Sequence, residues 1–227
     1  DELVIGQDTE ALVGMESIFV ISSPTGPLWN EQSGVYFVAD FEDDDEGFEP
    51  VGGSEGLWHL SEGRADDWFH SGDSSFYYGT GESRDTTGHY NVGRTHGILR
   101  SAPIEVSETV TNLQLSFQYF LQTESSSNWD KAEVRVLIEG AAVGDALKAD
   151  RTGSLATKLE HDAGPRWSQA TIDLGLVQGT ETDPVSITLE FEFDSRDAIL
   201  NNFEGWYIDD VMLQAVSKPA DISPARY

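Results

Sequence analysis

The chain has 227 residues, of which 41 are Asp or Glu and 13 are Lys or Arg, so its formal net charge is −28. A surface this acidic repels phosphate groups, which excludes nucleic acid as a class of partner. The chain contains no cysteine, so it has neither a disulfide framework nor a thiolate metal site. With 38% hydrophobic residues and 6 Trp, it holds enough apolar material for a packed core.

The location of the protein follows from its apolar runs and its first residue. The apolar runs are all much shorter than a membrane-spanning helix, so we expect no insertion into a membrane. The sequence begins with Asp1 rather than Met, which is typical of a secreted protein after removal of its signal peptide, or of an excised segment. We therefore expect an extracellular or cell-surface protein.

Residues 1–34 precede the main pattern and form a predicted N-terminal extension. They contain two apolar runs, Leu3–Gly6 and Ser17–Ser22, followed by residues typical of turns. Strand-forming residues outside the main pattern favour pairing with the edge of the chain's own sheet or with a neighbouring subunit. We expect this extension to act as a strand donor in a homo-oligomer or polymer.

Residues 35–216 contain recurring stretches with strand character, separated by Gly, Asn, Asp and Ser. The nine stretches are residues 35–41, 57–61, 74–79, 97–106, 113–123, 131–140, 167–174, 184–195 and 205–216. Alternation is clearest in residues 186–194, which place Ile187, Leu189, Phe191 and Phe193 on one face. The pattern predicts an all-β fold, an antiparallel jelly-roll β-sandwich over residues 35–216, with a C-terminal tail at residues 217–227.

Three stretches carry a resemblance to a known family: YFVADFEDDDEGFE at residues 36–49, HSGDSSFYYGTGE at residues 70–82 and GWYIDDVML at residues 205–213. Together they resemble the MAM-type jelly-roll domain of secreted bacterial and archaeal proteins. The two ends of the pattern are also similar to those of jelly-roll carbohydrate-binding modules. The resemblance implies a structural Ca2+ where the first and last strands meet, and the matching positions are Glu42 and Asp210.

The residues themselves also favour a metal at this junction. A jelly roll brings its first and last strands together, so carboxylates on both strands would repel one another unless a cation bridged them. A set of ligands made only of oxygen suits Ca2+. The resemblance implies that Asp40, Asp44, Asp73 and Asp209 are candidates for further ligands.

The alternation of residues 205–213 predicts where the adjacent acids point. If Trp206 and Ile208 face the core, Asp210 faces inward and Asp209 faces solvent. The alternative to a metal is that Asp210 accepts hydrogen bonds from backbone amides or Arg, and that residues 42–46 form a solvated turn.

Catalytic patterns are weak, and we predict that the chain is not an enzyme. Residues 52–56 match G-x-S-x-G, but a strand follows them where the nucleophile elbow requires a helix. Residues 72–75 superficially resemble a serine nucleophile segment but lead into a predicted strand. Four His, at positions 59, 70, 89 and 96, lack helical metal-ligand spacing. A surface metal site and structural hydrogen bonding are both open for them.

Three aromatic residues, Trp68, Tyr90 and Trp129, lie in polar surroundings typical of turns. They are candidates for a glycan-stacking platform, or they cover loops. The preferred interpretation is an extracellular, non-enzymatic, Ca2+-stabilised subunit that self-assembles into a surface or extracellular fibre. The alternatives are a carbohydrate-binding module or an accessory domain of a secreted peptidase.

Overall fold

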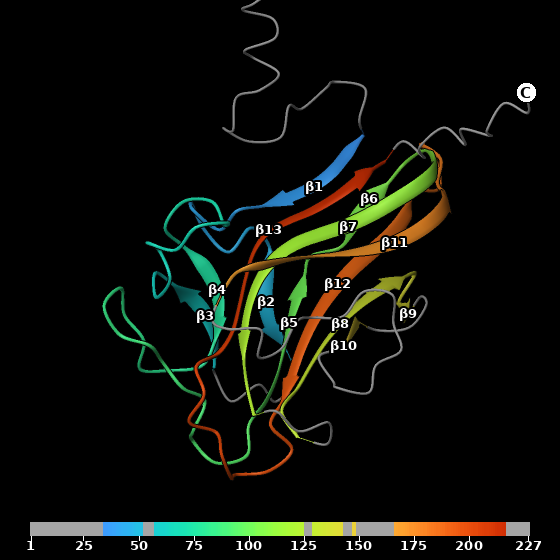
Figure 1. Cartoon of the computed structure of the whole chain (residues 1–227). Coiled ribbons are helices and arrows are strands. Elements are labelled where there is room, and N and C mark those ends of the chain that lie inside the picture. The colour runs from blue at the N-terminus through green and yellow to red at the C-terminus, as the bar shows by residue number, and fades with distance from the viewer. Residues whose placement is uncertain (1–33, 52–56, 125–128, 143–146, 149–165, 217–227) are drawn as a thin grey trace, which may run out of the picture. The chain divides into compact units, whose positions relative to one another are not determined.

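The computed structural model describes residues 34–51, 57–124, 129–142, 147–148 and 166–216. These residues form two antiparallel β-sheets (Figure 1). None of them lies in a helix of the length and apolarity that crossing a membrane requires. The predicted extension and tail fall outside the described residues, apart from Gly34, so strand addition and self-assembly stay predictions.

The first sheet contains both the first and the last described strand. Its strand order is β11, β7, β13, β4, β3, with β1 paired to the C-terminal half of β13. This pairing confirms that the first and last strands meet. The six strands are β1 (Val35–Ala39), β3 (Trp58–Ser61), β4 (Ser75–Tyr78), β7 (Thr109–Gln122), β11 (Ser168–Gln178) and β13 (Gly205–Ala215).

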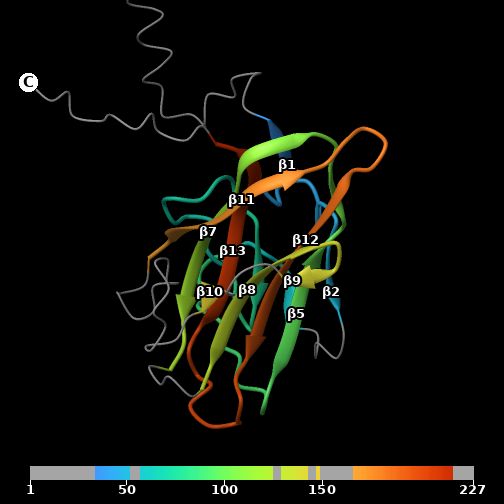
Figure 2. The same cartoon turned by 90° about the vertical axis from the view of Figure 1, so that its right-hand side faces the viewer.

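The second sheet has the order β10, β8, β12, β5, β2, with β6 paired to β12 and β9 paired to β8. Figure 2 shows β5, β12 and β8 side by side. The chain passes repeatedly between the sheets, as in β4 to β5, β6 to β7, β7 to β8 and β12 to β13, and the fold is a jelly-roll β-sandwich. The strands are β2 (Phe48–Val51), β5 (His96–Ser101), β6 (Ile104–Val106), β8 (Lys131–Ile138), β9 (Ala141–Ala142), β10 (Leu147–Lys148) and β12 (Val185–Asp194).

The main core lies between the sheets and is built by alternate residues of the long strands. The four predicted inward residues of β12 are fully buried, and the alternating apolar residues of β7 are buried as well. Aromatic rings from both sheets pack edge to face, for example Phe117 on Phe191 with ring centroids 5.2 Å apart. The period-two pattern therefore identified the core correctly.

A second, smaller cluster lies on the other side of the first sheet. It consists of Tyr77, Phe120, Trp167 and Tyr207, all buried, and we call it the outer aromatic layer. Residues 62–74, which we call the covering loop, pack over it. The Arg64 guanidinium lies 3.9 Å from the centroid of the Phe120 ring, and the His70 ring stacks on Trp167 with centroids 4.4 Å apart. Here both faces of the first sheet are buried.

Candidate functional site

The acidic pair of β13 lies at a β-bulge. The register between β13 and β7 shifts between Asp209 and Met212, and Asp210 has a positive φ of 48°. Trp206 and Ile208 face the core before the bulge, and Val211 faces it afterwards. The extra residue leaves Asp210 half-buried in the bulge, so the predicted inward orientation of Asp210 is wrong.

Asp209 points away from the main core, as the alternation predicts, but the prediction that it faces solvent is wrong. It is fully buried because the covering loop lies over this part of the first sheet. Its Oδ2 lies 2.9 Å from Nδ1 of His70, and the two side chains form a buried acid–imidazole pair. Alternation reports the direction of a side chain and cannot report what a distant loop places on top of it.

The contacts of His70 show where the proton of this pair lies. Nε2 is 2.9 Å from the backbone carbonyl oxygen of Arg64, which only accepts, so Nε2 carries a hydrogen. Nδ1 and Asp209 Oδ2 then share one further proton. Burial raises the pKa of Asp209 to about 7. Burial alone would lower the pKa of His70, but its hydrogen bonds to Asp209 and to the backbone carbonyls of Arg64 and Ser71, together with the charge of Asp209, outweigh burial and the pKa is raised. The pair therefore holds its proton near neutral pH.

Glu42 and Asp210 meet the same backbone segment, Ser71–Ser74. Backbone amides of this segment donate to the two carboxylates at distances of 2.7 to 3.1 Å. Gly72, which has a φ of 55°, permits this approach, because a Cβ there would lie 1.9 Å from Cδ of Glu42. The structure thus brings the two matched acids to one place, with the amide partners that the alternative to a metal predicts.

The other predicted ligands do not join them. Asp40 and Asp44 accept amide hydrogen bonds within their own turn, and Asp73 pairs with Arg84 at 2.9 Å. In the part of the chain that the structure describes, no three His, Asp or Glu side chains converge on one metal position. Two carboxylates remain, Glu42 and Asp210, and their oxygens have the chemistry that Ca2+ prefers.

The three aromatic candidates for glycan stacking are not gathered on one surface. Tyr90 is fully buried and its hydroxyl donates to Asp130, so it cannot stack on a sugar, and that prediction is wrong. Trp68 is 83% exposed in the covering loop of the first sheet, beside the exposed Phe69. Trp129, 42% exposed, immediately precedes β8 of the second sheet.

The catalytic candidates are not assembled either. Residues 52–56 lie outside the described residues, and Ser75 is buried in β4. His59, His70 and His96 each pair with a different acid, namely Glu82 at 2.7 Å, Asp209 at 2.9 Å and Glu192 at 2.8 Å. Structural hydrogen bonding, the alternative for these histidines, accounts for all three.

A feature that the sequence analysis missed lies on the outer face of the second sheet. The central strand β12 presents three acids there, and basic side chains flank them from the neighbouring strands and from the residues that precede β5 and follow β12. We call this set the polar ladder; it comprises Glu190, Glu192 and Asp194 with Arg94, His96, Arg100, Arg135 and Arg196.

The ladder holds its acids in fixed geometry. Arg100 reaches Glu190 through both Nε and Nη2, at 2.8 and 2.6 Å. Glu192 accepts from His96 at 2.8 Å on one side and from Arg135 on the other. Burial alone would lower the pKa of Arg135, but the attraction of Glu192 and Glu133 outweighs it and the pKa is raised.

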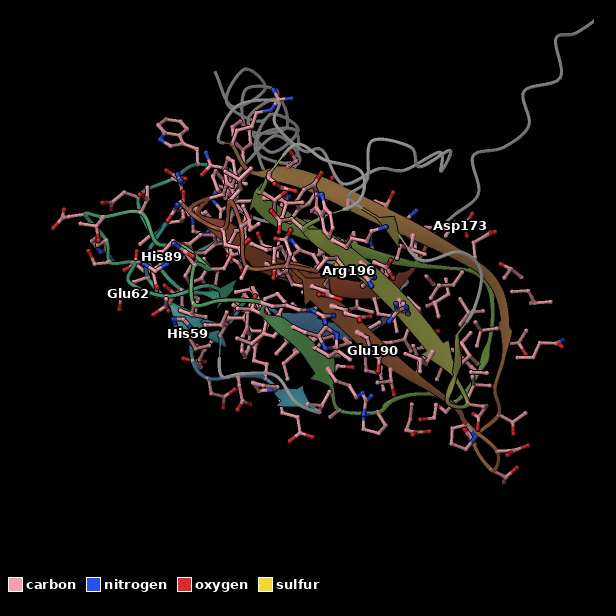
Figure 3. The ribbon with its side chains drawn as sticks, turned by 90° about the horizontal axis from the view of Figure 1, so that it is seen from below. His59, Glu62, His89, Asp173, Glu190 and Arg196 are labelled. Atoms are coloured by element: carbon pink, nitrogen blue, oxygen red, sulfur yellow. The ribbon has the colours of Figure 1, made fainter. Side chains whose placement is uncertain are left out.

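The acids are nearly buried, whereas the bases remain reachable. The Glu190 side chain is 8% exposed and that of its partner Arg100 is 43% exposed. The sequence does show acids alternating along β12, but the positions of Arg100 and Arg135 opposite Glu190 depend on strand register. Figure 3 shows Glu190 and Arg196 apart from the group formed by His59, Glu62 and His89.

A pocket of about 530 Å³ adjoins one end of the ladder. Arg100 belongs to both, and Thr188 extends the outward row of β12 into the pocket. The pocket is lined by polar side chains, among them Glu49, and by the apolar Ala102 and Pro103. Its volume falls within the usual range of about 300–1,000 Å³ for ligand sites. The pocket and the polar ladder together form the candidate binding surface.

No protein-family model matches the sequence, and no curated protein matches it. Several solved structures are similar. A carbohydrate-binding module of family 28, specific for non-crystalline cellulose, has a TM-score of 0.47 and 12% identity over 78% of this chain and 94% of that chain. The module CBM27-1 of Caldicellulosiruptor saccharolyticus, in complex with mannohexaose, has a TM-score of 0.45 and 14% identity over 80% of this chain and 98% of that chain.

The enzymatically active domain of bacteriophage CBA120 tailspike protein 4 is also similar, with a TM-score of 0.40 and 14% identity over 74% of this chain but 19% of that chain. The comparisons agree with the expected resemblance to jelly-roll carbohydrate-binding modules, and they name no MAM-type domain. They include binding modules and an enzymatically active domain, so the absence of catalytic activity stays a prediction.

Proposed function

We propose that this chain is an extracellular, non-enzymatic binding module for neutral polysaccharides, and that the polar ladder and its adjoining pocket contact the sugar hydroxyls. The observation that carries the proposal is the open row of fixed donors and acceptors on β12, where the Glu190 side chain is 8% exposed beside an Arg100 that is 43% exposed. The proposal rests on this surface.

A saccharide presents many hydroxyl groups, each of which donates and accepts a hydrogen bond. The ladder offers carboxylate acceptors and guanidinium donors side by side, already held in place by one another, so little side-chain entropy is lost on binding. An anionic ligand would be repelled by a chain with a formal net charge of −28, which favours a neutral polymer.

The length of the surface favours a polymer over a single sugar. Thr188 and Asp194 are six residues apart on β12, a span of about 20 Å at about 3.3 Å per residue. The pocket lies at the Thr188 end, and Lys131, which follows Trp129 and Asp130, pairs in register with Asp194 at the other end. Trp129 offers one aromatic ring near that end for stacking.

Affinity electrophoresis through gels containing cellulose derivatives, xylan, mannan or β-glucan tests the proposal. At least one neutral polysaccharide should retard the wild-type protein. Arg100→Ala should abolish the retardation, and Thr188→Val, which removes one hydroxyl and no ion pair, should weaken it. Arg84→Ala is the matched control, because Arg84 is 38% exposed, is paired with acids and lies away from the ladder. The proposal would be contradicted if Arg100→Ala and Thr188→Val were retarded as strongly as the wild type and the Arg84→Ala control.

We infer that a structural Ca2+ is the cofactor, held by Glu42 and Asp210 against the Ser71–Ser74 segment. The support is that both carboxylates reach this one segment, within 3.1 Å of its backbone amides. A bound Ca2+ would neutralise the two acids where the first and last strands meet. Its effect would be on stability, because the junction is on the first sheet and the polar ladder is on the second.

A further inference from the structure

Three connections between the two sheets meet at one end of the sandwich, in the lower part of Figure 1. Their described residues are 79–95 between β4 and β5, 123–124 and 129–130 between β7 and β8, and 195–204 between β12 and β13. Hydrogen bonds join them: the Asn201 side chain donates to the carbonyl of Gly93 at 2.9 Å, and the Tyr90 hydroxyl donates to Asp130 at 2.7 Å.

Asp130 and Asn201, which both lie in these connections, each have a side-chain oxygen that is buried without a donor. Asp130 is 1% exposed, and its Oδ2 accepts from Tyr90 and from the amide of Glu124, whereas its Oδ1 has no hydrogen-bond partner. Asn201 is fully buried, and its amide nitrogen donates to Gly93 and Asp197, whereas its Oδ1 has no partner. A buried acceptor without a partner is unfavourable, so a group that occupied these two oxygens would stabilise the native protein.

The surrounding charge is negative. The carboxylates of Glu124 and Asp197 lie near that of Asp130. The three acids lie in two of the connections. A hydrogen bond joins these two connections, because the Asp130 amide donates to the carbonyl oxygen of Ser195 at 3.4 Å. Among the described residues, no Lys, Arg or His is ion-paired with Asp130 or Asp197. A buried carboxylate without a positive partner is unfavourable.

We propose that this end of the sandwich binds a divalent cation of the calcium type, with Oδ1 of Asp130 and Oδ1 of Asn201 as its side-chain ligands. A carboxylate, an amide oxygen and backbone carbonyls are the mixed oxygen ligands that Ca2+ takes. A cation here would supply both a partner for the two oxygens and a positive charge beside Asp130 and Asp197. This site is separate from the Glu42 and Asp210 junction and does not depend on glycan binding.

Terbium luminescence tests the site directly in the full chain. Tb3+ takes the same oxygen ligands as Ca2+, and its emission is sensitised by nearby Trp and Tyr; here Trp129 is adjacent to Asp130 and Tyr90 is hydrogen-bonded to it. The parent variant is Glu42→Gln combined with Asp210→Asn, which silences the other junction. In this parent we expect saturable luminescence that Ca2+ displaces.

Adding Asp130→Asn to the parent should weaken Tb3+ and Ca2+ binding at least tenfold. The substitution removes the charge but keeps an oxygen that accepts from Tyr90. Thermal unfolding gives a second readout. Without Ca2+ the Asp130→Asn variant should unfold at the same or a higher temperature than its parent, because a repelling charge is gone, and with excess Ca2+ it should unfold at a lower one.

Luminescence and a Ca2+-induced rise in melting temperature that Asp130→Asn leaves unchanged would overturn the site. So would a parent that shows no saturable luminescence. If the Asp130→Asn variant does not fold, Asp197→Asn takes its place, because it also removes a neighbouring charge. There too, several-fold weaker Tb3+ binding supports the site and unchanged binding overturns it.

Discussion

The buried pair of His70 and Asp209 should make the stability of the protein depend on pH. In the folded protein the pair holds one shared proton, and its Nε2 hydrogen is fixed by the Arg64 carbonyl at 2.9 Å. In the unfolded chain the pKa of Asp is about 3.9 and the pKa of His is about 6.5. Between these values the folded and unfolded states bind the same number of protons. Above about pH 6.5 the unfolded chain releases a proton that the folded pair retains.

Stability should therefore fall as pH rises above about 6.5, by up to about 1.4 kcal/mol per pH unit, until the pair itself loses its proton. The raised pKa values of both partners agree with this direction. The side chains are 1% and 0% exposed, so solvent screening does little to reduce the effect.

Asp209→Asn should reverse this dependence. The introduced amide can donate to Nδ1 of a neutral His70, which keeps the hydrogen bond without the shared proton. A protonated His70 would then be buried without a counter-charge, so its folded pKa falls below 6.5. The unfolded chain then binds more protons at low pH, and stability should rise with pH up to about 6.5.

Urea unfolding of both proteins at steps from about pH 5 to about pH 8 measures the effect. The free energy of unfolding of Asp209→Asn minus that of the wild type should increase by about 1–3 kcal/mol from the lowest to the highest pH. The titration of other groups is the same in both proteins and cancels in this difference. His59→Gln is the control, because it removes a 39%-exposed histidine outside the buried pair, so its curve should differ from that of the wild type by less than the curve of Asp209→Asn does. Parallel curves for the wild type and Asp209→Asn would refute the shared proton.

Three further outcomes follow from the first sheet. Gly72→Ala should cost about 1–3 kcal/mol in urea unfolding, because a residue with a Cβ is strained at a φ of 55° and its Cβ would displace the Glu42 carboxylate from the backbone amides; an unchanged midpoint would contradict this contact. Arg64→Lys should cost about 1–3 kcal/mol, because Lys cannot reproduce the two-point contact with the 3%-exposed Glu204; a cost below about 0.5 kcal/mol would show that the contact is not maintained in solution. Excess Ca2+ should raise the melting temperature of the wild type above that in chelator with matched ionic strength, and Glu42→Gln combined with Asp210→Asn should reduce the rise; an equal rise in both would remove Ca2+ from this junction.

Alternation predicted most of the sandwich because each long strand has one face in the core. It identified β12 and β7 with their buried residues, and the meeting of β1 with β13 followed from the topology of a jelly roll. Alternation did not predict the short strands, because β9 and β10 have two residues each and are too short to show a repeating pattern. The edge strand β2 is not among the predicted stretches; it contains Pro50, which an edge position tolerates.

The candidate sites were harder to predict because they depend on contacts between distant segments. The predictions for Asp209 and Tyr90 were wrong because the covering loop buries Asp209 and because Tyr90 packs into the main core against Phe193. The bulge at Asp210 adds one residue to β13, and the sequence has no glycine at that position that would indicate a bulge. The polar ladder needed the register that sets Arg100 and Arg135 on either side of Glu190, which composition cannot supply.

Mapping amide chemical-shift changes by NMR during titration with the polysaccharide that retards the protein most tests the central claim most directly. We expect the largest changes along β5, β8 and β12, centred on Arg100, Glu190 and Glu192, and little change in the covering loop. Changes concentrated around Trp68 in the covering loop, or no change with any neutral polysaccharide, would contradict the assignment of glycan binding to the polar ladder.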